Sequence, residues 1–167
     1  MDDAGPVRAH VGIGANLGDA RVSVEQAIVR LGQLPGTRLV ARSSLYRSAP
    51  VEAEGPDFVN AAVALDTSLD AEALLAQLQA LERAHGRERP FRHAPRTLDL
   101  DLLTWGQRVS ENPLLTLPHP RLHLRAFVLE PLFELAPGLA LPRLGPIAVW
   151  RQRAQGQRIE RLAPAGR

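Results

Sequence analysis

The stretch from Ala94 to Leu103 reads APRTLDLDLL and predicts the strand around which the rest of the chain is arranged. Residues i and i+2 of a strand point to the same face, so Asp99 and Asp101 project together and the intervening leucines project to the other face. The leucine run favours a packed, central strand over 97–105. Two carboxylates this close together repel each other unless a cation lies between them.

Upstream of these aspartates, four arginines crowd into the ten residues 87–96: Arg87, Arg89, Arg92 and Arg96. Guanidinium groups bind phosphates in a bidentate manner, and carboxylates hold Mg²⁺. The two features together indicate phosphoryl-group chemistry, which uses both. On spacing alone, a pair of solvated acids at a sheet edge and a solvated arginine loop remain alternatives. The direct connection between loop and strand favours the functional interpretation.

The composition is that of an ordinary globular protein: 167 residues, 45% hydrophobic and 23% charged, from which we expect one domain over 1–167. The chain has no cysteine, which excludes disulfides, thiolate metal sites and a cysteine nucleophile. All 20 basic side chains are arginine, which excludes the lysine-dependent phosphate loop and Schiff-base chemistry. The same bias explains a pI of about 10.3 at a net charge of +2, so the pI is weak support for nucleic-acid binding.

The beginning of the chain has neither a basic segment nor a long apolar run, and no membrane-spanning stretch follows. We therefore expect a cytoplasmic protein that is a monomer and has no membrane or nucleic-acid partner. The tail over 152–167 is rich in arginine and is expected to be a solvated, peripheral end.

Hydrophobic periodicity and turn residues predict the order strand, helix, strand, strand, helix, strand. The strands are expected over 8–13, 38–47, 58–65 and 97–105, with one helix from an N-cap at Asp19 to Pro35 and another from Asp70 to a C′ residue at Gly86. This order predicts an α+β, ferredoxin-like βαββαβ antiparallel sheet with helices packed on it. A hairpin strand over 108–110 and a helix over 126–135 would form a C-terminal elaboration.

Two pairs of residues offer further candidate contacts. Phe58 and Asn60 share one face of the third predicted strand, where an aromatic ring and an amide suit a flat heteroaromatic ligand but also suit a core. Gln79 and Glu82 lie three positions apart on the second predicted helix, away from its leucine stripe. They form either ordinary helix surface or part of a neighbouring site.

A histidine between two prolines lies in another candidate cluster, which follows the hairpin: Thr116, His119, Arg121, Arg125 and Phe127. The stiff backbone suits a ligand contact and also suits a simple turn. Gly12 and Gly14 resemble the start of a dinucleotide-binding fingerprint, but Leu17 stands where the third glycine belongs. A tight turn is therefore the preferred interpretation of the two glycines.

Five stretches of the chain support one another: Gly14 to Gly18, Ser44 to Ser48, Asp57 to Ala62, Leu117 to Arg121, and the run Arg92-x-Ala94-Pro95-Arg96-x-x-Asp99-Leu100-Asp101-Leu102-Leu103. In their order along the chain, these stretches resemble the 6-hydroxymethyl-7,8-dihydropterin pyrophosphokinase family of folate biosynthesis. The resemblance extends over about residues 8–142, and the run from Arg92 is its most specific part.

The resemblance implies the ferredoxin-like fold and transfer of pyrophosphate from ATP, the co-substrate, to the pterin hydroxymethyl group, with release of AMP. It implies two Mg²⁺ ions on Asp99 and Asp101, and we expect Arg87 and Arg96 to stabilise charge on the transferring group. The implied pterin contacts are Ser48, Val51, Phe58, Asn60 and Phe127. The implied ATP contacts are Gln79, Glu82, Arg89, Arg92, His93, Leu102, Thr116, His119 and Arg125.

Three residues depart from the family pattern. Phe58 stands where tyrosine is common, His93 where some members have tryptophan, and Pro120 where some have tyrosine. None belongs to the metal pair, so they bear on affinity and loop closure rather than on reaction type. A palm-type nucleotidyl transferase, which would release pyrophosphate, and an RNA-binding module of the same fold remain alternatives.

Overall fold

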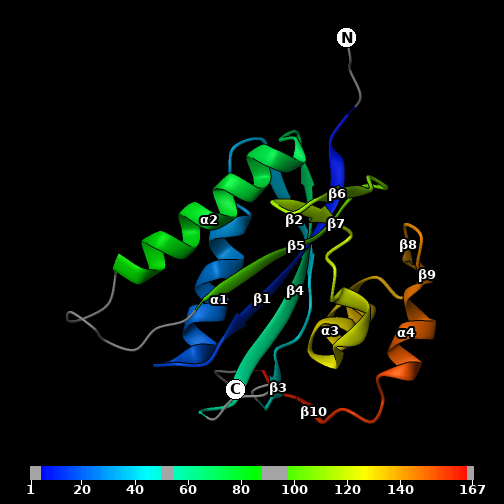
Figure 1. Ribbon diagram of the computed structural model, residues 1–167. Helices are drawn as coiled ribbons and strands as arrows, with labels where there is room; N and C mark the ends of the chain where they lie inside the picture. The colour runs from blue at the N-terminus through cyan, green and yellow to red at the C-terminus, as the bar shows by residue number, and fades with distance from the viewer. Residues whose placement is uncertain (1–4, 50–54, 88–97, 165–167) are drawn as a thin grey trace.

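The computed structural model describes residues 5–49, 55–87 and 98–164. Its centre is an antiparallel sheet in the order β10-β3-β4-β1-β5, with β2 also paired to β4 (Figure 1). The strands are β1 (Val7–Ala15), β2 (Thr37–Arg42), β3 (Tyr46–Ser48), β4 (Phe58–Thr67), β5 (Asp99–Trp105) and β10 (Ile159–Arg161). The order β5-β1-β4-β2 is that of a ferredoxin-like βαββαβ sheet, which confirms the predicted fold class.

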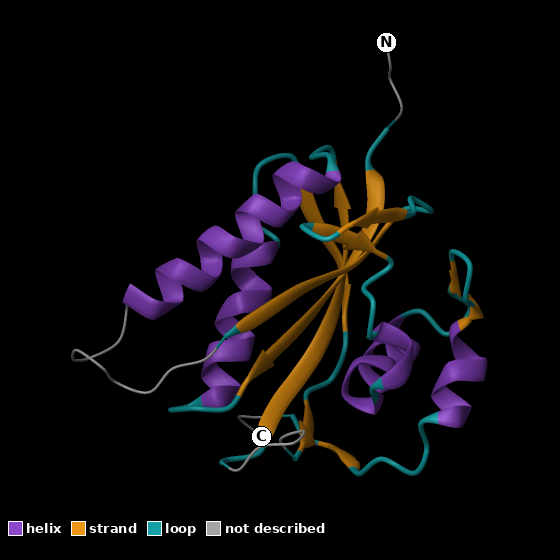
Figure 2. Ribbon diagram, viewed as in Figure 1, coloured by secondary structure: helices purple, strands orange, loops and turns teal. Residues whose placement is uncertain are grey.

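Two pairs of helices cover the two faces of this sheet (Figure 2). One face is covered by α1 (Ala20–Leu31) and α2 (Ala71–Arg87), and the other by α3 (Ala126–Leu135) and α4 (Ile147–Arg153). The predicted N-cap is confirmed, because the Asp19 carboxylate accepts the Val22 amide at 3.3 Å. The α1 helix ends at Leu31, before the predicted end, and α2 continues through Gly86, which is therefore not a C′ residue.

The two faces bury separate apolar cores. The first core joins α1 and α2 to the inward-facing residues of β1, β4 and β5, and it includes the leucines that alternate with the aspartates. The second core joins α3 and α4 to Ala62 and Leu103. Leu102 belongs to the first core and Leu103 to the second, because successive side chains of a strand point to opposite faces. The strand β5 therefore contributes to both cores.

The strand that carries the aspartates lies at an edge of the sheet, so the expected central position was wrong. The leucine run is nevertheless buried because α2 packs over it; Leu100 is 5% exposed. The outer side of β5 is also occupied, since the Glu82 carboxylate of α2 accepts the Leu100 amide at 2.7 Å. Packing by one helix therefore produced a burial pattern typical of an inner strand.

The predicted strand over 38–47 is divided into β2 and β3. The division occurs at Ser44, whose amide and hydroxyl both donate to the Glu134 carboxylate of α3, at 3.0 and 2.9 Å. A backbone amide used by a helix side chain is not available to a neighbouring strand, so the ladder is interrupted there.

The elaboration after β5 contains β6 (Ser110–Asn112) and β7 (Leu115–Leu117), the 3₁₀ turn η1 (Leu122–Leu124), and β8 (Ala140–Leu141) with β9 (Gly145–Pro146). The hairpin strand begins two residues later than predicted, and α3 confirms the predicted helix with Pro131 inside it. The tail differs from the expected solvated end, because β10 pairs with β3 and extends the sheet. None of the helices in the described ranges is long and apolar enough to cross a membrane.

Candidate active site

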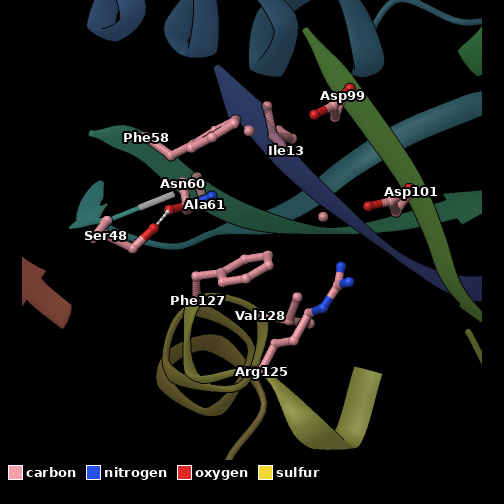
Figure 3. A pocket seen from close by; sticks show the side chains of 13 residues that line it. Ile13, Ser48, Phe58, Asn60, Ala61, Asp99, Asp101, Arg125, Phe127 and Val128 are labelled. Atoms are coloured by element: carbon pink, nitrogen blue, oxygen red, sulfur yellow. Dashed lines mark hydrogen bonds between the residues drawn. The ribbon is translucent and has the colours of Figure 1, made fainter. Parts of the chain in front are cut away.

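A cavity of about 260 Å³ lies between the sheet and the beginning of α3 (Figure 3). Five segments of the chain meet there: the last residues of β1 and β3, the first residues of β4 and β5, and the turn into α3. The residues that line it are Gly12, Ile13, Gly14, Ser48, Ala49, Phe58, Asn60, Ala61, Asp99, Asp101, Arg125, Phe127 and Val128. The two aspartates and all the predicted pterin contacts in the described ranges are therefore lining residues of one cavity.

Two glycines in β1 form part of the cavity floor. Gly14 pairs with Asp99 on one side and with Asn60 on the other, and Gly12 pairs with Asp101. The glycines lie inside a strand, so the predicted tight turn was wrong. A β-carbon on Gly14 would lie 3.2 Å from the Asn60 amide nitrogen, closer than a side chain normally packs. Glycine in a strand often marks a place where a ligand approaches the backbone. The two glycines one residue apart were therefore the sequence signal for the cavity floor, which the interpretation as a turn missed.

The apolar part of the cavity has an aromatic ring on each side. Figure 3 shows Phe58 projecting from β4 and Phe127 from the first turn of α3, with Asn60 on the sheet between them. Asn60 is buried, and its carbonyl oxygen accepts the Ser48 hydroxyl at 2.6 Å. This bond fixes the orientation of the amide, so the two rings and the amide together match a flat, polar heterocycle.

The opposite end of the cavity is acidic. Asp99 and Asp101 project from the same face of β5, as predicted, and the Asp101 side chain is 44% exposed (Figure 3). The described residues contain no group of three or more histidine or acidic side chains that could hold a metal ion. Two carboxylates without a third protein ligand suit Mg²⁺, which commonly takes one or two carboxylates and completes its shell with water and phosphate oxygens.

Two basic side chains lie near the acidic end. The His119 imidazole is 3.8 Å from the Asp101 carboxylate, and its backbone amide donates to the Leu103 carbonyl at 2.9 Å. Burial lowers the pKa of His119, with Asp101 opposing the shift and Arg125 and Arg121 adding to it. Arg125 lines the cavity and lies 5.4 Å from the Phe127 ring centre in a cation–π contact. An anionic group at this end of the cavity would therefore meet the positive charge of Arg125, whereas the lowered pKa of His119 favours its neutral form.

Other predicted ATP contacts lie outside the cavity lining. Leu102 is buried in the first core, so its side chain is not available to a nucleotide. Gln79 is exposed on α2, Glu82 binds the β5 backbone, and the Thr116 hydroxyl donates to the Asn112 carbonyl at 3.1 Å. The predictions for Val51, Arg89, Arg92, His93 and Arg96 fall outside the described residues, and Arg87 is placed only as the last residue of α2.

Comparisons with known proteins give one consistent result. Residues 10–137 match the model of a family described as 7,8-dihydro-6-hydroxymethylpterin-pyrophosphokinase. The chain is 48% identical over 136 residues to a 2-amino-4-hydroxy-6-hydroxymethyldihydropteridine pyrophosphokinase of Pseudomonas aeruginosa, covering 81% of this chain and 84% of that one. It is 41% identical over 137 residues to the protein of the same name from Haemophilus influenzae, covering 81% and 86%.

Among solved structures, the chain is similar to the Plasmodium falciparum HPPK-DHPS S436F/A437G/A613S triple mutant with SDX-DHP. The TM-score is 0.73 at 14% sequence identity, over 92% of this chain and 45% of that chain. An HPPK-DHPS crystallised in complex with substrates gives a TM-score of 0.72 at 11% identity, over 90% and 43%. This chain therefore spans less than half the length of those solved chains, and the likeness concerns the fold alone.

Proposed function

Since the chain belongs to the 7,8-dihydro-6-hydroxymethylpterin pyrophosphokinase family, we propose that the cavity between the sheet and α3 is where it transfers pyrophosphate from ATP to the hydroxymethyl group of 6-hydroxymethyl-7,8-dihydropterin. The reaction belongs to folate biosynthesis, and AMP is its second product. Membership of this family decides against the nucleotidyl transferase and the RNA-binding module that the sequence left open.

The observation that carries this assignment is the shared floor of the cavity, on which ring-binding and metal-binding residues are neighbours. Gly14 pairs with Asn60 on one side and with Asp99 on the other, so one strand separates the amide from the nearer carboxylate. A pterin between Phe58 and Phe127 would present its polar edge to the Asn60 amide. Its hydroxymethyl group would then point toward the acidic end, where the triphosphate would lie.

The two carboxylates of Asp99 and Asp101 would hold two Mg²⁺ ions. Bound there, the ions would neutralise charge on the triphosphate and orient it. Oxygen ligands on a strand with partly exposed carboxylates support this choice of metal. Arg125 would contribute a fixed positive charge at the same end, and Arg87 and Arg96 are our candidates for stabilising charge on the transferred group.

The chemical step joins the hydroxymethyl oxygen of the pterin to the β-phosphorus of ATP. The bond from the β-phosphorus to the oxygen that bridges it to the α-phosphorus breaks, and that oxygen leaves with AMP. The hydroxyl proton passes to solvent. The chain's residues contribute mainly by holding the ring in line with the phosphate and by preorganised positive charge.

The site assignment is tested by Asp99→Ala and Asp101→Ala, each assayed with ATP, Mg²⁺ and the hydroxymethyl pterin. We expect kcat to fall by at least about 100-fold for each variant, because an electrostatic contact to the reacting group is removed. Glu111→Ala is the matched control, since this exposed carboxylate pairs with Arg143 and lies outside the cavity lining. Near-normal turnover of either aspartate variant would refute the assignment.

The identity of the nucleotide product tests the reaction itself. AMP is expected from pyrophosphoryl transfer, whereas ADP would indicate transfer of a single phosphoryl group. We further propose that the enzyme is a cytoplasmic monomer. Light scattering of the purified protein would detect a dimer.

A further inference from the structure

The beginning of α3 lacks a local cap. Its N-cap residue is Arg125, whose side chain makes no capping hydrogen bond, so the first amides of the helix need another partner. Gln157 supplies one from the C-terminal segment. Its side-chain oxygen accepts the Ala126 amide at 2.8 Å, and its side-chain nitrogen donates to the Leu124 carbonyl at 2.8 Å. One glutamine thus holds the backbone on both sides of Arg125.

This short piece of backbone carries two residues of the cavity. Arg125 and Phe127 lie on either side of Ala126, and Figure 3 shows both side chains pointing toward the sheet from the start of α3. Their directions follow from the conformation of the turn into the helix. A residue that holds this turn therefore sets where the Phe127 ring and the Arg125 guanidinium meet a ligand.

The same C-terminal segment also holds the opposite wall. Ile159, two residues after Gln157, pairs with Ser48 in the sheet, and the Leu162 amide donates to the Leu45 carbonyl at 2.8 Å. Ser48 in turn orients Asn60. The segment from Gln157 to Leu162 therefore connects the wall that bears Phe127 with the wall that bears Ser48. It lies outside the residues that match the family model, 10–137.

We propose that Gln157 is a positioning residue for the pterin site. It holds the turn from η1 into α3 in the conformation that presents Phe127 and Arg125 to the cavity, and it touches neither substrate nor metal. This inference rests on the proposed function, because it takes the cavity to be the pterin site.

The test compares Gln157→Ala with Gln157→Glu and with Gln155→Ala, a control at an exposed glutamine two residues earlier. For Gln157→Ala we expect the Kd and KM for the pterin to rise about threefold to tenfold, because the binding-competent turn is less populated. The Kd for ATP should rise as well, because Arg125 lies on the same turn. Hydrogen exchange of the peptide over 124–128 should quicken. Glutamate keeps an acceptor for the Ala126 amide but cannot donate to the Leu124 carbonyl, so Gln157→Glu should restore only part of the pterin affinity.

Three outcomes would overturn the inference. They are an unchanged pterin Kd in Gln157→Ala, an equal loss in Gln155→Ala, and faster hydrogen exchange throughout the chain instead of over 124–128. The last outcome would mean general destabilisation, which the Tm of each variant would show. Failure of the proposed function is distinct, because the unsubstituted protein would then form no AMP in the presence of the pterin.

Discussion

The hydrogen bond from Ser48 to Asn60 offers the sharpest test of how the proposed pterin end of the cavity is built. Both residues are buried, at 6% and 4% exposure, and the two oxygens are 2.6 Å apart. Ser48→Ala leaves the carbonyl of the buried Asn60 without this donor. The cost of an unsatisfied buried acceptor is about 1 to 2 kcal/mol, which corresponds to a Tm lower by about 2 to 8 °C in a chain of this size.

The same substitution should weaken pterin binding specifically. Without the serine, the Asn60 amide is free to rotate and presents its donors to the ligand for only part of the time. We expect the pterin Kd to rise about threefold to tenfold, with kcat at saturating pterin nearly unchanged, because the population of the competent orientation is what falls. Calorimetric titration of the pterin, together with steady-state kinetics, measures both quantities.

A matched control is Ser68→Ala. The hydroxyl of this exposed serine donates to the Gly36 carbonyl at 3.3 Å and lies outside the cavity lining. The Tm and pterin Kd of this variant should stay at the values of the unsubstituted protein. If Ser48→Ala also keeps both values, the amide is held by something other than Ser48 and our reasoning about this end of the cavity is refuted.

Three further predictions concern the cavity floor, the pH dependence of stability and the second core. Gly14→Ala should raise the pterin KM at least about threefold, because its β-carbon would lie 3.2 Å from the Asn60 amide nitrogen and must displace it; an unchanged KM would show that the floor can adjust. Burial, with a smaller contribution from Arg8, lowers the pKa of His10 to about 4. The unfolded chain therefore binds a proton at His10 more readily than the folded chain does. The free energy of unfolding should fall by about 3 kcal/mol as the pH drops from 6.5 toward 4. In His10→Gln, the free energy of unfolding measured with urea should change less over this pH range. Leu132→Ala, at a fully buried site, should cost about 2 to 5 kcal/mol in chemical denaturation, whereas Leu114→Ala, at 84% exposure, should cost less than about 0.5 kcal/mol.

In one region of the molecule, the contacts that hold α3 to the sheet also connect the two walls of the proposed pterin site. Glu134 of α3 accepts the Ser44 amide and hydroxyl and also the Tyr46 hydroxyl, at 2.7 Å, so it ties the helix that bears Phe127 to the strand that bears Ser48. Hydrogen bonds from these groups lower the pKa of Glu134 against the opposing effect of burial, and Arg161 adds to the lowering. The charged form is therefore the one that holds the two walls together at neutral pH.

The sequence by itself determined the features that depend on neighbouring residues. Alternation in the stretch from Leu98 to Leu102 decided that two aspartates share a face opposite a leucine core, because side chains alternate along any strand. An aspartate before a helical pattern located the start of α1. The order of strands and helices was enough for the ferredoxin-like topology, and five short stretches were enough for the family.

Only the tertiary structure decided the features that depend on which distant segments meet. Nothing local marks β5 as an edge strand, because α2 buries its leucines as completely as a second sheet neighbour would. The pairing of β1 with β4 and β5 places Gly12 and Gly14 on the floor of the cavity, although the same two glycines look like a turn in the sequence. Gln157 reaches the start of α3 from 31 residues away, and no periodicity or spacing predicts such a contact. Which residues line the cavity depends on how distant segments pack against one another, and the sequence of a single segment does not determine this packing.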